Sequence, residues 1–524
     1  MRCNNRSNGP SNTGVWTSYG IAGTLDAASG DAALIRRSRD FSTGDRLEPG
    51  HREDHRNPFR RRASAHRRPL VIESMSTAIV WFRRDLRLED NPAWAAATEA
   101  HDEIVPALVI EPALLDTAGP HRRRAFLTAA EALDRSITEL GGRLHVRIGD
   151  PVRILPALAE KADAAAVYAN ADVSRWAQRR DTAVESALGV SIEWHWGTLA
   201  HAPGTVLTKA GTVSRVFTPF SKQWFAVPMR PEAVAHDIAV TTDPGDGLPA
   251  SDGAESAVLA ELRVDAWQAN VDAYDDTRDL PAVDGTSRLS TALRFGTVSP
   301  RSLAEAFGTH SPGRQGFVRQ LAWRDWYAHI THQFTDIDRR AIRPEYDGIA
   351  WQTGPAADEE FTAWAEGRTG FPIVDAGMRQ LAESGWMHNR VRMITASFLV
   401  KDLLIDWRRG ERHFRHLLSD AEPSQNAGNW QWVAGTGPDA APYFRIFNPW
   451  SQSRKFDASG DYIRRWVPEL AGLDATTIHE PAAAAPLDLA AAGVVLGDTY
   501  PEPIVDHAFA RDRTLAAYKA ALGK

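Results

Sequence analysis

Short apolar runs alternate with helical stretches from Thr77 onward, and this alternation stops at about Tyr274. The apolar runs lie at 78–82, 104–110, 144–147, 165–169 and 190–194 and are predicted to be strands. Between them, helices are predicted near 122–140, 152–161 and 175–188. Continuous apolar strands separated by helices are typical of a parallel sheet that is covered on both faces. The sequence therefore predicts an α/β N-terminal domain with a doubly wound parallel sheet.

Beyond Tyr274 only helices are predicted, at 302–307, 315–331, 359–366, 372–384, 389–407 and 411–418. Residues 391–407 are apolar on nearly every face, which predicts a central buried helix. Residues 206–270 are rich in Pro, Gly, Asp and Ala and are expected to form a connector that packs on the surface. The predicted organisation is an α/β domain over 75–205, a connector over 206–270 and an all-α domain over 271–524.

Residues 1–70 hold 13 arginines, no lysine and seven acidic residues, with no apolar core after a basic start. This pattern excludes a secretory signal. We expect residues 1–74 to be disordered, or to be an extension that precedes the true start at Met75. The single cysteine, Cys3, excludes a disulfide framework and thiolate metal sites and suits a reducing cytoplasm. No apolar run approaches the ~20 residues of a membrane span.

The stretch 385–432 carries Trp386, Trp407, Trp430 and Trp432 among apolar helix, arginines and asparagines. Indole is the most easily oxidised common side chain, so this stretch suits a redox chromophore. The first strand is followed by Arg-Arg-Asp-Leu-Arg-Leu over 83–88 instead of the glycine-rich dinucleotide fingerprint. No HExxH motif occurs in this stretch, so no catalytic metal is expected.

Three smaller patterns each allow two interpretations. The loop 284–290, with Gly285 and several hydroxyl side chains, can cradle a pyrophosphate or simply cap a helix. Gln320 and Trp323 are neighbours on a helical face and can receive a planar base or pack in a core. Arg392 on a buried helix needs an anionic partner, for which Asp420 is a candidate, and nearby basic residues can contact phosphates or form a solvated face.

Together these patterns match one family. The motifs on which this match rests are WFRRDLRLEDNP (81–92), VFTPFSKQW (216–224), FPIVDAGMRQL (371–381), the block 385–407, DAAPYFRIFNPWSQSRKFD (439–457) and YPEPIVDHAFARDRTLAAY (500–518). On these motifs the chain resembles the photolyase/cryptochrome flavoproteins, and most closely the microbial class I cyclobutane pyrimidine dimer photolyases. The resemblance extends from about Thr77 to the C-terminus.

The resemblance implies that FAD binds in the helical domain. The matching cofactor positions are Tyr274, Thr286, Ser287, Arg288, Leu289, Ser290, Phe317, Arg324, Asn389, Arg392, Asp420, Ala421, Glu422 and Asn426. Among them, Asn426 matches the residue that faces flavin N5, and Phe317 occupies a position that is Trp in well-known relatives. Trp430, Trp407 and Trp351 match a chain that re-reduces the flavin from the protein surface, and Trp386 is expected to pack beside these sites.

The resemblance also implies a pocket for a flipped-out pyrimidine dimer in DNA. The matching substrate or DNA positions are Gln320, Trp323, Arg324, Tyr327, Asn389, Arg390, Val391, Met393, Trp432 and Gln452. The implied reaction is light-driven repair, in which reduced FAD gives an electron to the dimer and the cyclobutane ring splits. Gln320 stands where many class I enzymes have Glu, which predicts retained repair with a lower quantum yield. Asn389 and Met393 replace the two histidines implied for six-four photoproduct repair.

The α/β domain resembles the antenna domain of this family. Tyr168–Val173 and the arginines after it resemble the deazaflavin type (8-hydroxy-5-deazaflavin) more than the methenyltetrahydrofolate type. Binding of damaged DNA is expected to be independent of sequence, and a cytoplasmic monomer is expected. The alternative is a cryptochrome-like photosensor without repair activity. The retained pocket residues and the absence of a long segment after residue 518 favour repair.

Overall fold

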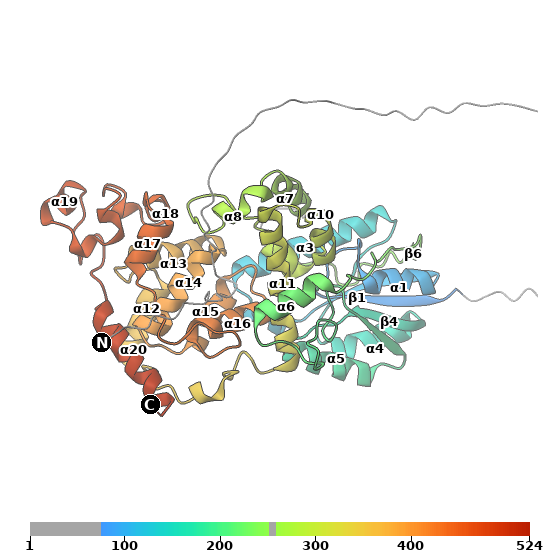
Figure 1. Cartoon of the computed structure of the whole chain (residues 1–524). Coiled ribbons are helices and arrows are strands. Elements are labelled where there is room, and N and C mark those ends of the chain that lie inside the picture. The colour runs from blue at the N-terminus through green and yellow to red at the C-terminus, as the bar shows by residue number, and fades with distance from the viewer. Residues whose placement is uncertain (1–74, 251–257, 524) are drawn as a thin grey trace, which may run out of the picture. The chain divides into compact units, whose positions relative to one another are not determined.

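The computed structural model describes residues 75–250 and 258–523, so the predictions for residues 1–74 lie outside the described residues. Five strands form a parallel sheet in the order β3-β2-β1-β4-β5, and a short sixth strand pairs with β2 (Figure 1). The strands are β1 (Thr77–Phe82), β2 (Glu103–Ile110), β3 (His145–Ile148), β4 (Ala164–Asn170), β5 (Ser191–His195) and β6 (Ala239–Val240). The intervening helices are α1 (Pro92–Ala100), α2 (Pro112–Thr117), α3 (Pro120–Glu139), α4 (Pro151–Lys161) and α5 (Arg175–Ala187).

Successive residues of β1 face opposite sides of the sheet, as the pleat of a strand requires. Val80 and Phe82 belong to a buried cluster with Trp94 of α1 and apolar residues of α3. Trp81 belongs to a second cluster with Leu155 of α4 and Val184 of α5. Helices therefore cover both faces of the sheet, and the predicted doubly wound α/β domain is confirmed.

The expectation that residues 206–270 pack on the surface is wrong for part of this segment. The helix α6 (Phe217–Ala226) buries Phe217, Phe220 and Trp224, each about 1% exposed, in a core cluster of the helical domain. Trp224 Nε1 donates a hydrogen bond of 2.8 Å to the buried Asp325. The composition hid this helix because Pro and Gly lie on both sides of a short apolar face. The domain boundaries at 205 and 270 stay predictions.

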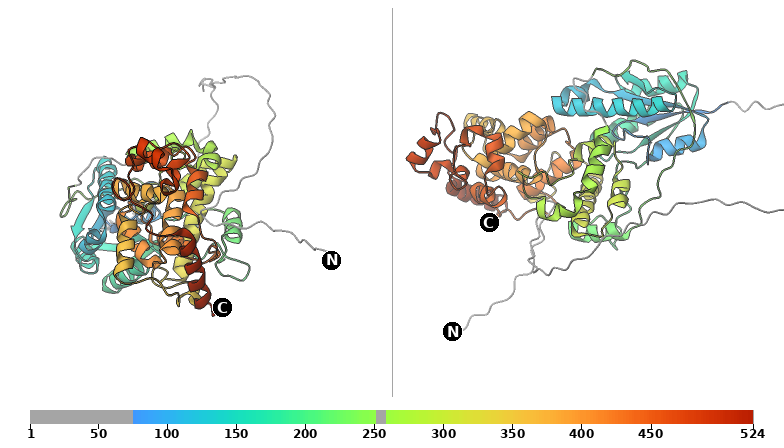
Figure 2. Two further views of the ribbon diagram at one scale, coloured as in Figure 1. Left: turned by 90° about the vertical axis from the view of Figure 1, so that its left-hand side faces the viewer. Right: turned by 90° about the horizontal axis from the view of Figure 1, so that it is seen from above.

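The remaining described chain is helical, and after Val240 the described residues form no further strand (Figure 2). Its α-helices are α7 (Val258–Gln268), α8 (Tyr274–Thr277), α9 (Ser290–Phe295), α10 (Pro300–Phe307), α11 (Pro312–Gln333), α12 (Pro355–Ala365), α13 (Pro372–Ser384), α14 (Asn389–Ser397), α15 (Trp407–Leu417), α16 (Pro423–Ala434), α17 (Pro449–Phe456), α18 (Asp461–Trp466), α19 (Pro486–Ala491) and α20 (His507–Ala521). Shorter 3₁₀ turns are η1 (Val271–Ala273), η2 (Pro344–Tyr346), η4 (Pro468–Leu470), η5 (Thr477–His479) and η6 (Pro481–Ala483), and η3 (Phe398–Asp402) is a π-helical turn. The predicted all-α domain is confirmed.

The predicted continuous helix over 389–407 is wrong. The helix α14 ends at Ser397 and continues into η3, after which Leu404 adopts a left-handed backbone with φ of 53°. Asp406 then begins α15 by accepting a hydrogen bond from the amide of Arg408. Lys401 and Asp402 directly before the break are charged but buried among apolar residues, so the apolar pattern continues on both sides of it. As a result Trp407 starts α15, which packs against α16.

Candidate functional site

The helical domain encloses a cavity of about 240 Å³, here named the helical-domain cavity. Its wall comes from the loop before α9, from α11, α14, α15 and α16, and from the segments before α14 and α16. The lining residues are Tyr274, Thr286, Ser287, Arg288, Leu289, Ser290, Leu293, Phe317, Gln320, Leu321, Trp323, Arg324, Trp386, Met387, Asn389, Arg392, Ala396, Phe414, Leu418, Asp420, Ala421, Glu422, Gln425, Asn426, Asn429, Trp430 and Val433. Every residue for which the sequence predicts a cofactor contact lies in this wall.

In the loop 284–290 the left-handed backbone conformation is not at the glycine. A Cβ on Gly285 would lie 2.6 Å from Cβ of Thr277, so glycine serves a close approach there. The left-handed residue is Arg288, with φ of 51°. Its Nε lies 2.9 Å from Oδ1 of Asp284, and its guanidinium carbon lies 4.5 Å from the ring centroid of Trp386. The loop thus turns its hydroxyl side chains along the cavity while Arg288 packs on Trp386.

The predicted partnership of Arg392 and Asp420 is confirmed. The two terminal nitrogens of Arg392 donate to the two carboxylate oxygens of Asp420 at 3.1 and 2.8 Å. The Nε of Arg392 donates to the carbonyl oxygen of Met387 at 2.8 Å. Because the Asp420 side chain is only 3% exposed, this bidentate pair compensates a buried charge. It fixes the turn before α16 against α14.

The orientation of the Asn426 amide is set by a residue outside the cavity. Asn426 Nδ2 donates to Oε1 of Glu411 at 2.9 Å and to the main-chain oxygen of Glu411 at 3.0 Å. A carboxylate only accepts hydrogen bonds, so the NH₂ of Asn426 must face Glu411. Burial raises the pKa of Glu411, which Arg415 opposes. Asn426 therefore has its carbonyl oxygen free for the cavity, and the sequence carried no signal for the role of Glu411.

Gln320 and Trp323 lie side by side in the wall on α11. The ring of Trp323 is 4% exposed and stacks on Phe217 of α6, with centroids 3.3 Å apart. Gln320 Nε2 donates to the Gly316 carbonyl at 3.3 Å. Trp323 thus packs in the core through Phe217 and also lines the cavity, and binding of a planar base by this pair stays a prediction.

Other predicted substrate positions lie outside the wall of this cavity. Arg390 is buried and pairs with Asp279 at 2.6 Å. Tyr327 donates to Oδ1 of Asn429, a residue of the wall, at 3.0 Å. The remaining positions are Val391, Met393 and Trp432, which are buried, and Gln452, which is half-buried on α17.

The three tryptophans predicted as a chain belong to one apolar cluster. Trp430 lines the cavity and is 2% exposed, and Trp407 is fully buried. Trp351 is half-buried and packs against the same cluster. Trp386, for which sequence reasoning expected only packing, lies in the cavity wall.

A second cavity of about 590 Å³, here named the interface cavity, lies between the ends of the strands and the helical domain. It is lined by α/β-domain residues that include Arg83, Arg84, Glu111, Trp176 and Arg180. Helical-domain residues, among them Arg294, Glu411, Arg415 and Ala421, complete it. A ligand at the carboxyl ends of strands is common in doubly wound sheets.

Within residues 75–250 and 258–523, no three His, Cys, Asp or Glu side chains are grouped to hold a metal ion. No helix in the same ranges is both long and apolar enough to cross a membrane.

Comparison with known proteins agrees with this architecture. Residues 78–237 match the family model described as DNA photolyase, and residues 317–520 match the FAD binding domain of DNA photolyase. A deoxyribodipyrimidine photo-lyase of Agrobacterium fabrum is 39% identical over 85% of this chain and 99% of its own length. A bacterial class III photolyase structure from Agrobacterium tumefaciens has a TM-score of 0.80 at 37% identity, covering 88% of this chain and all of that one. A Synechocystis cryptochrome structure has a TM-score of 0.79 at 26% identity, covering 84% of this chain and 99% of that one.

An α/β domain joined to a helical FAD-binding domain defines a two-domain flavoprotein. The polar and aromatic wall of the helical-domain cavity suits a flavin dinucleotide, since it offers hydroxyls, arginines, an oriented amide and flat indole faces. The chain belongs to the DNA photolyase family.

Proposed function

We propose that this chain is a deoxyribodipyrimidine photo-lyase, a light-driven lyase that splits cyclobutane pyrimidine dimers in DNA. The observation that carries the proposal is the wall of the helical-domain cavity. There, residues suited to a flavin lie beside Gln320, Trp323 and Asn389, which suit a flipped-out base. The names of the curated relatives support the same reaction.

FAD is proposed to bind in the helical-domain cavity. When bound, it supplies the light-excited electron for ring splitting. Tyr274 and the loop 286–290 would hold the phosphates, and burial raises the pKa of Tyr274 to about 12, so its phenol remains a donor. Arg392 would hold the flavin ring, the turn Asp420–Glu422 would lie under the adenine half, and Asn426 would accept a hydrogen bond from N5–H. The apolar side chains around Trp430, among them Phe414 and Val433, would keep water from that side of the reacting groups.

Trp430, Trp407 and Trp351 are proposed to return electrons to the flavin from the surface. The proposal is supported by their graded exposure, from the cavity wall through a fully buried ring to a half-buried one. Aromatic rings in one packed cluster offer short steps between oxidisable groups.

The damaged dinucleotide is proposed to enter beside Trp323 and Trp432, with Asn389 and Met393 below it. Among the predicted contact positions, Gln452 is half-buried and would contact the DNA strand near the entrance. Tyr327, Arg390 and Val391 are buried, so they would support the wall beneath the entrance. Contacts to phosphate carry no sequence information, so binding should be independent of sequence and sensitive to salt.

The interface cavity is proposed to hold a second, antenna chromophore. Arg175, Arg179 and the ring of Trp176 line this cavity and suit an anionic planar molecule, either a deazaflavin or a methenyltetrahydrofolate. We further propose a cytoplasmic monomer, and the assignment to class I stays a prediction.

A photosensor without repair activity is the second candidate, because this chain has the same fold as the Synechocystis cryptochrome structure. One assay separates the two. The purified protein with reduced FAD is mixed with DNA that carries thymine dimers and is lit with blue light, and a dark sample is the control. Loss of dimers in the light alone supports repair, whereas unchanged dimer content with FAD bound would exclude it.

A further inference from the structure

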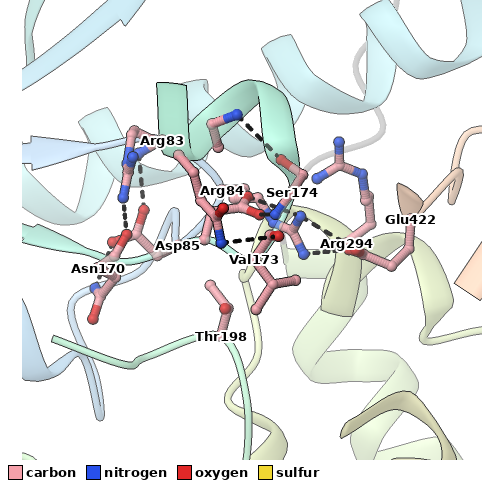
Figure 3. A network of polar contacts seen from close by, with 12 residues as sticks. Arg83, Arg84, Asp85, Asn170, Val173, Ser174, Thr198, Arg294 and Glu422 are labelled. Carbon is pink, nitrogen blue, oxygen red and sulfur yellow. Dashed lines mark hydrogen bonds and ion pairs between the residues drawn. The ribbon is translucent and has the colours of Figure 1, made fainter. Parts of the chain in front are cut away.

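A buried ion-pair network crosses between the α/β domain and the helical domain at Arg84 (Figure 3). Arg84 follows β1, and its side chain is 15% exposed. One terminal nitrogen donates to Oδ2 of Asp172 at 3.1 Å and to Oε1 of Glu422 at 3.3 Å. The other donates to Oε2 of Glu422. One guanidinium therefore joins a carboxylate of its own domain to one that lies 338 residues further along the chain.

Glu422 belongs to the turn that precedes α16, and this turn has three anchors. Arg392 holds Asp420, and Arg294 Nε donates to the carbonyl oxygen of Ala421 at 2.9 Å. Both of these anchors come from the helical domain. The third anchor, on Glu422, is Arg84 from the α/β domain. All three residues of the turn line the helical-domain cavity, and Ala421 lines the interface cavity as well.

The charges of this network explain why the anchor is strong. Burial alone would raise the pKa of Glu422, but Arg84, Arg294 and Arg324 outweigh burial and the opposing Asp172, and they lower it. Asp172 is itself fixed, because its Oδ1 accepts from the amide of Ser174 at 2.8 Å. Arg84 thus extends from a fixed point in one domain to the turn before α16 in the other.

We propose that Arg84 is a positioning residue for the flavin. It holds the turn Asp420–Glu422 in the shape that FAD requires, so the α/β domain is part of the FAD site although it touches no flavin atom. This inference rests on the proposed location of FAD. Without Arg84, Glu422 and Asp172 would be two buried carboxylates without their shared cation, and the turn would move toward water to relieve them.

The test measures FAD affinity of the apoprotein, by quenching of FAD fluorescence on binding. Arg84→Met should weaken FAD binding by about tenfold or more, because a buried charge loses its partner. The matched control is Arg83→Met. Arg83 is the neighbouring residue, is similarly buried, and bonds Asp181 and the carbonyl of Asn170, both within the α/β domain. The FAD affinity of the Arg83→Met variant should stay within about twofold of that of the wild type. An equal loss in both variants would overturn the inference.

A double-mutant cycle with Glu422→Gln separates positioning from general damage. Arg84→Met should have little further effect once Glu422 is neutral, whereas an unchanged tenfold loss in that background would overturn the inference. Arg84→Lys, which keeps the charge but cannot bridge both carboxylates, should give an intermediate affinity and serves if the methionine variant does not fold. Wild-type affinity in Arg84→Lys would count against bridging. A wild type that binds no FAD would instead refute the proposed function.

Discussion

Replacing Glu411 by glutamine should lower the reduction potential of the bound flavin. In the wild type both donated bonds of the Asn426 amide go to Glu411, at 2.9 and 3.0 Å. The carbonyl of Asn426 is thereby free for N5–H, which oxidised flavin lacks. In the Glu411→Gln variant the main-chain oxygen of residue 411 still accepts from Asn426, but the side-chain bond is to a neutral amide instead of a carboxylate. The preference for the orientation that points the Asn426 carbonyl into the cavity therefore weakens, and with it the preference for reduced flavin.

The size of the effect follows from the bonds that change. A hydrogen bond to a charged group contributes about 1.5–3 kcal/mol and a neutral one about 0.5–1.5 kcal/mol. The free-energy preference for the orientation that points the Asn426 carbonyl into the cavity should therefore fall by about 1 kcal/mol. This corresponds to about 40 mV in the reduction potential of a one-electron step. Because the Glu411 side chain is 1% exposed and Gln has nearly the same volume, the fold should survive.

The assay is a spectroelectrochemical titration of the FAD-loaded protein. Arg415→Met is the control, since it removes the other partner of Glu411, at 2.9 Å, and leaves both bonds to Asn426. Burial raises the pKa of Glu411, so the difference between wild type and Glu411→Gln should narrow as the carboxylate takes up a proton at acid pH. An unchanged or higher potential in Glu411→Gln at neutral pH would refute the reasoning.

Three further predictions concern repair, electron return and stability. Gln320→Glu should raise the number of dimers repaired per absorbed photon, and equal yields under the same light would contradict the proposed role of this position. Trp407→Phe should slow light-driven reduction of bound oxidised FAD by more than an order of magnitude, whereas Trp364→Phe, which removes another fully buried indole, should not. Burial lowers the pKa of Lys401 to about 7 in the folded protein, whereas an unfolded chain has a lysine pKa of about 10. Between these two pH values the unfolded state binds one more proton than the folded state, so the free energy of unfolding rises with pH in that range. Lys401→Met should remove this rise and increase the melting temperature at about pH 7.5, where the buried amine is costly; a lower melting temperature would contradict it.

Local pattern predicted much of the architecture and most of the cavity wall. The alternation of apolar runs and helices identified the parallel sheet, because burial on both faces leaves strands apolar throughout. The residues 286–290 and 420–422 matched family positions and do line one cavity. The pairing of Arg392 with Asp420 was also predictable, since a buried arginine requires an anion.

Other features were decided by side chains that meet only in the folded molecule. The break before α15 depends on a left-handed Leu404, and the charged pair before it, Lys401 and Asp402, is buried, so the sequence pattern does not separate this break from a continuing helix. The stacking of Phe217 on Trp323 required a helix that composition had assigned to a surface connector. Glu411 shows the same limit, because its bond to Asn426 joins two helices whose separate sequences give no sign of it.

The sequence by itself determined the class of fold, the family and the segments that form the helical-domain cavity, because hydrophobic periodicity and contiguous motifs are local properties. Only the tertiary structure decided which way the Asn426 amide points and that Arg84 reaches Glu422 from the other domain. Those outcomes depend on burial and on charges brought together across long stretches of chain, where a carboxylate without its partner would be costly.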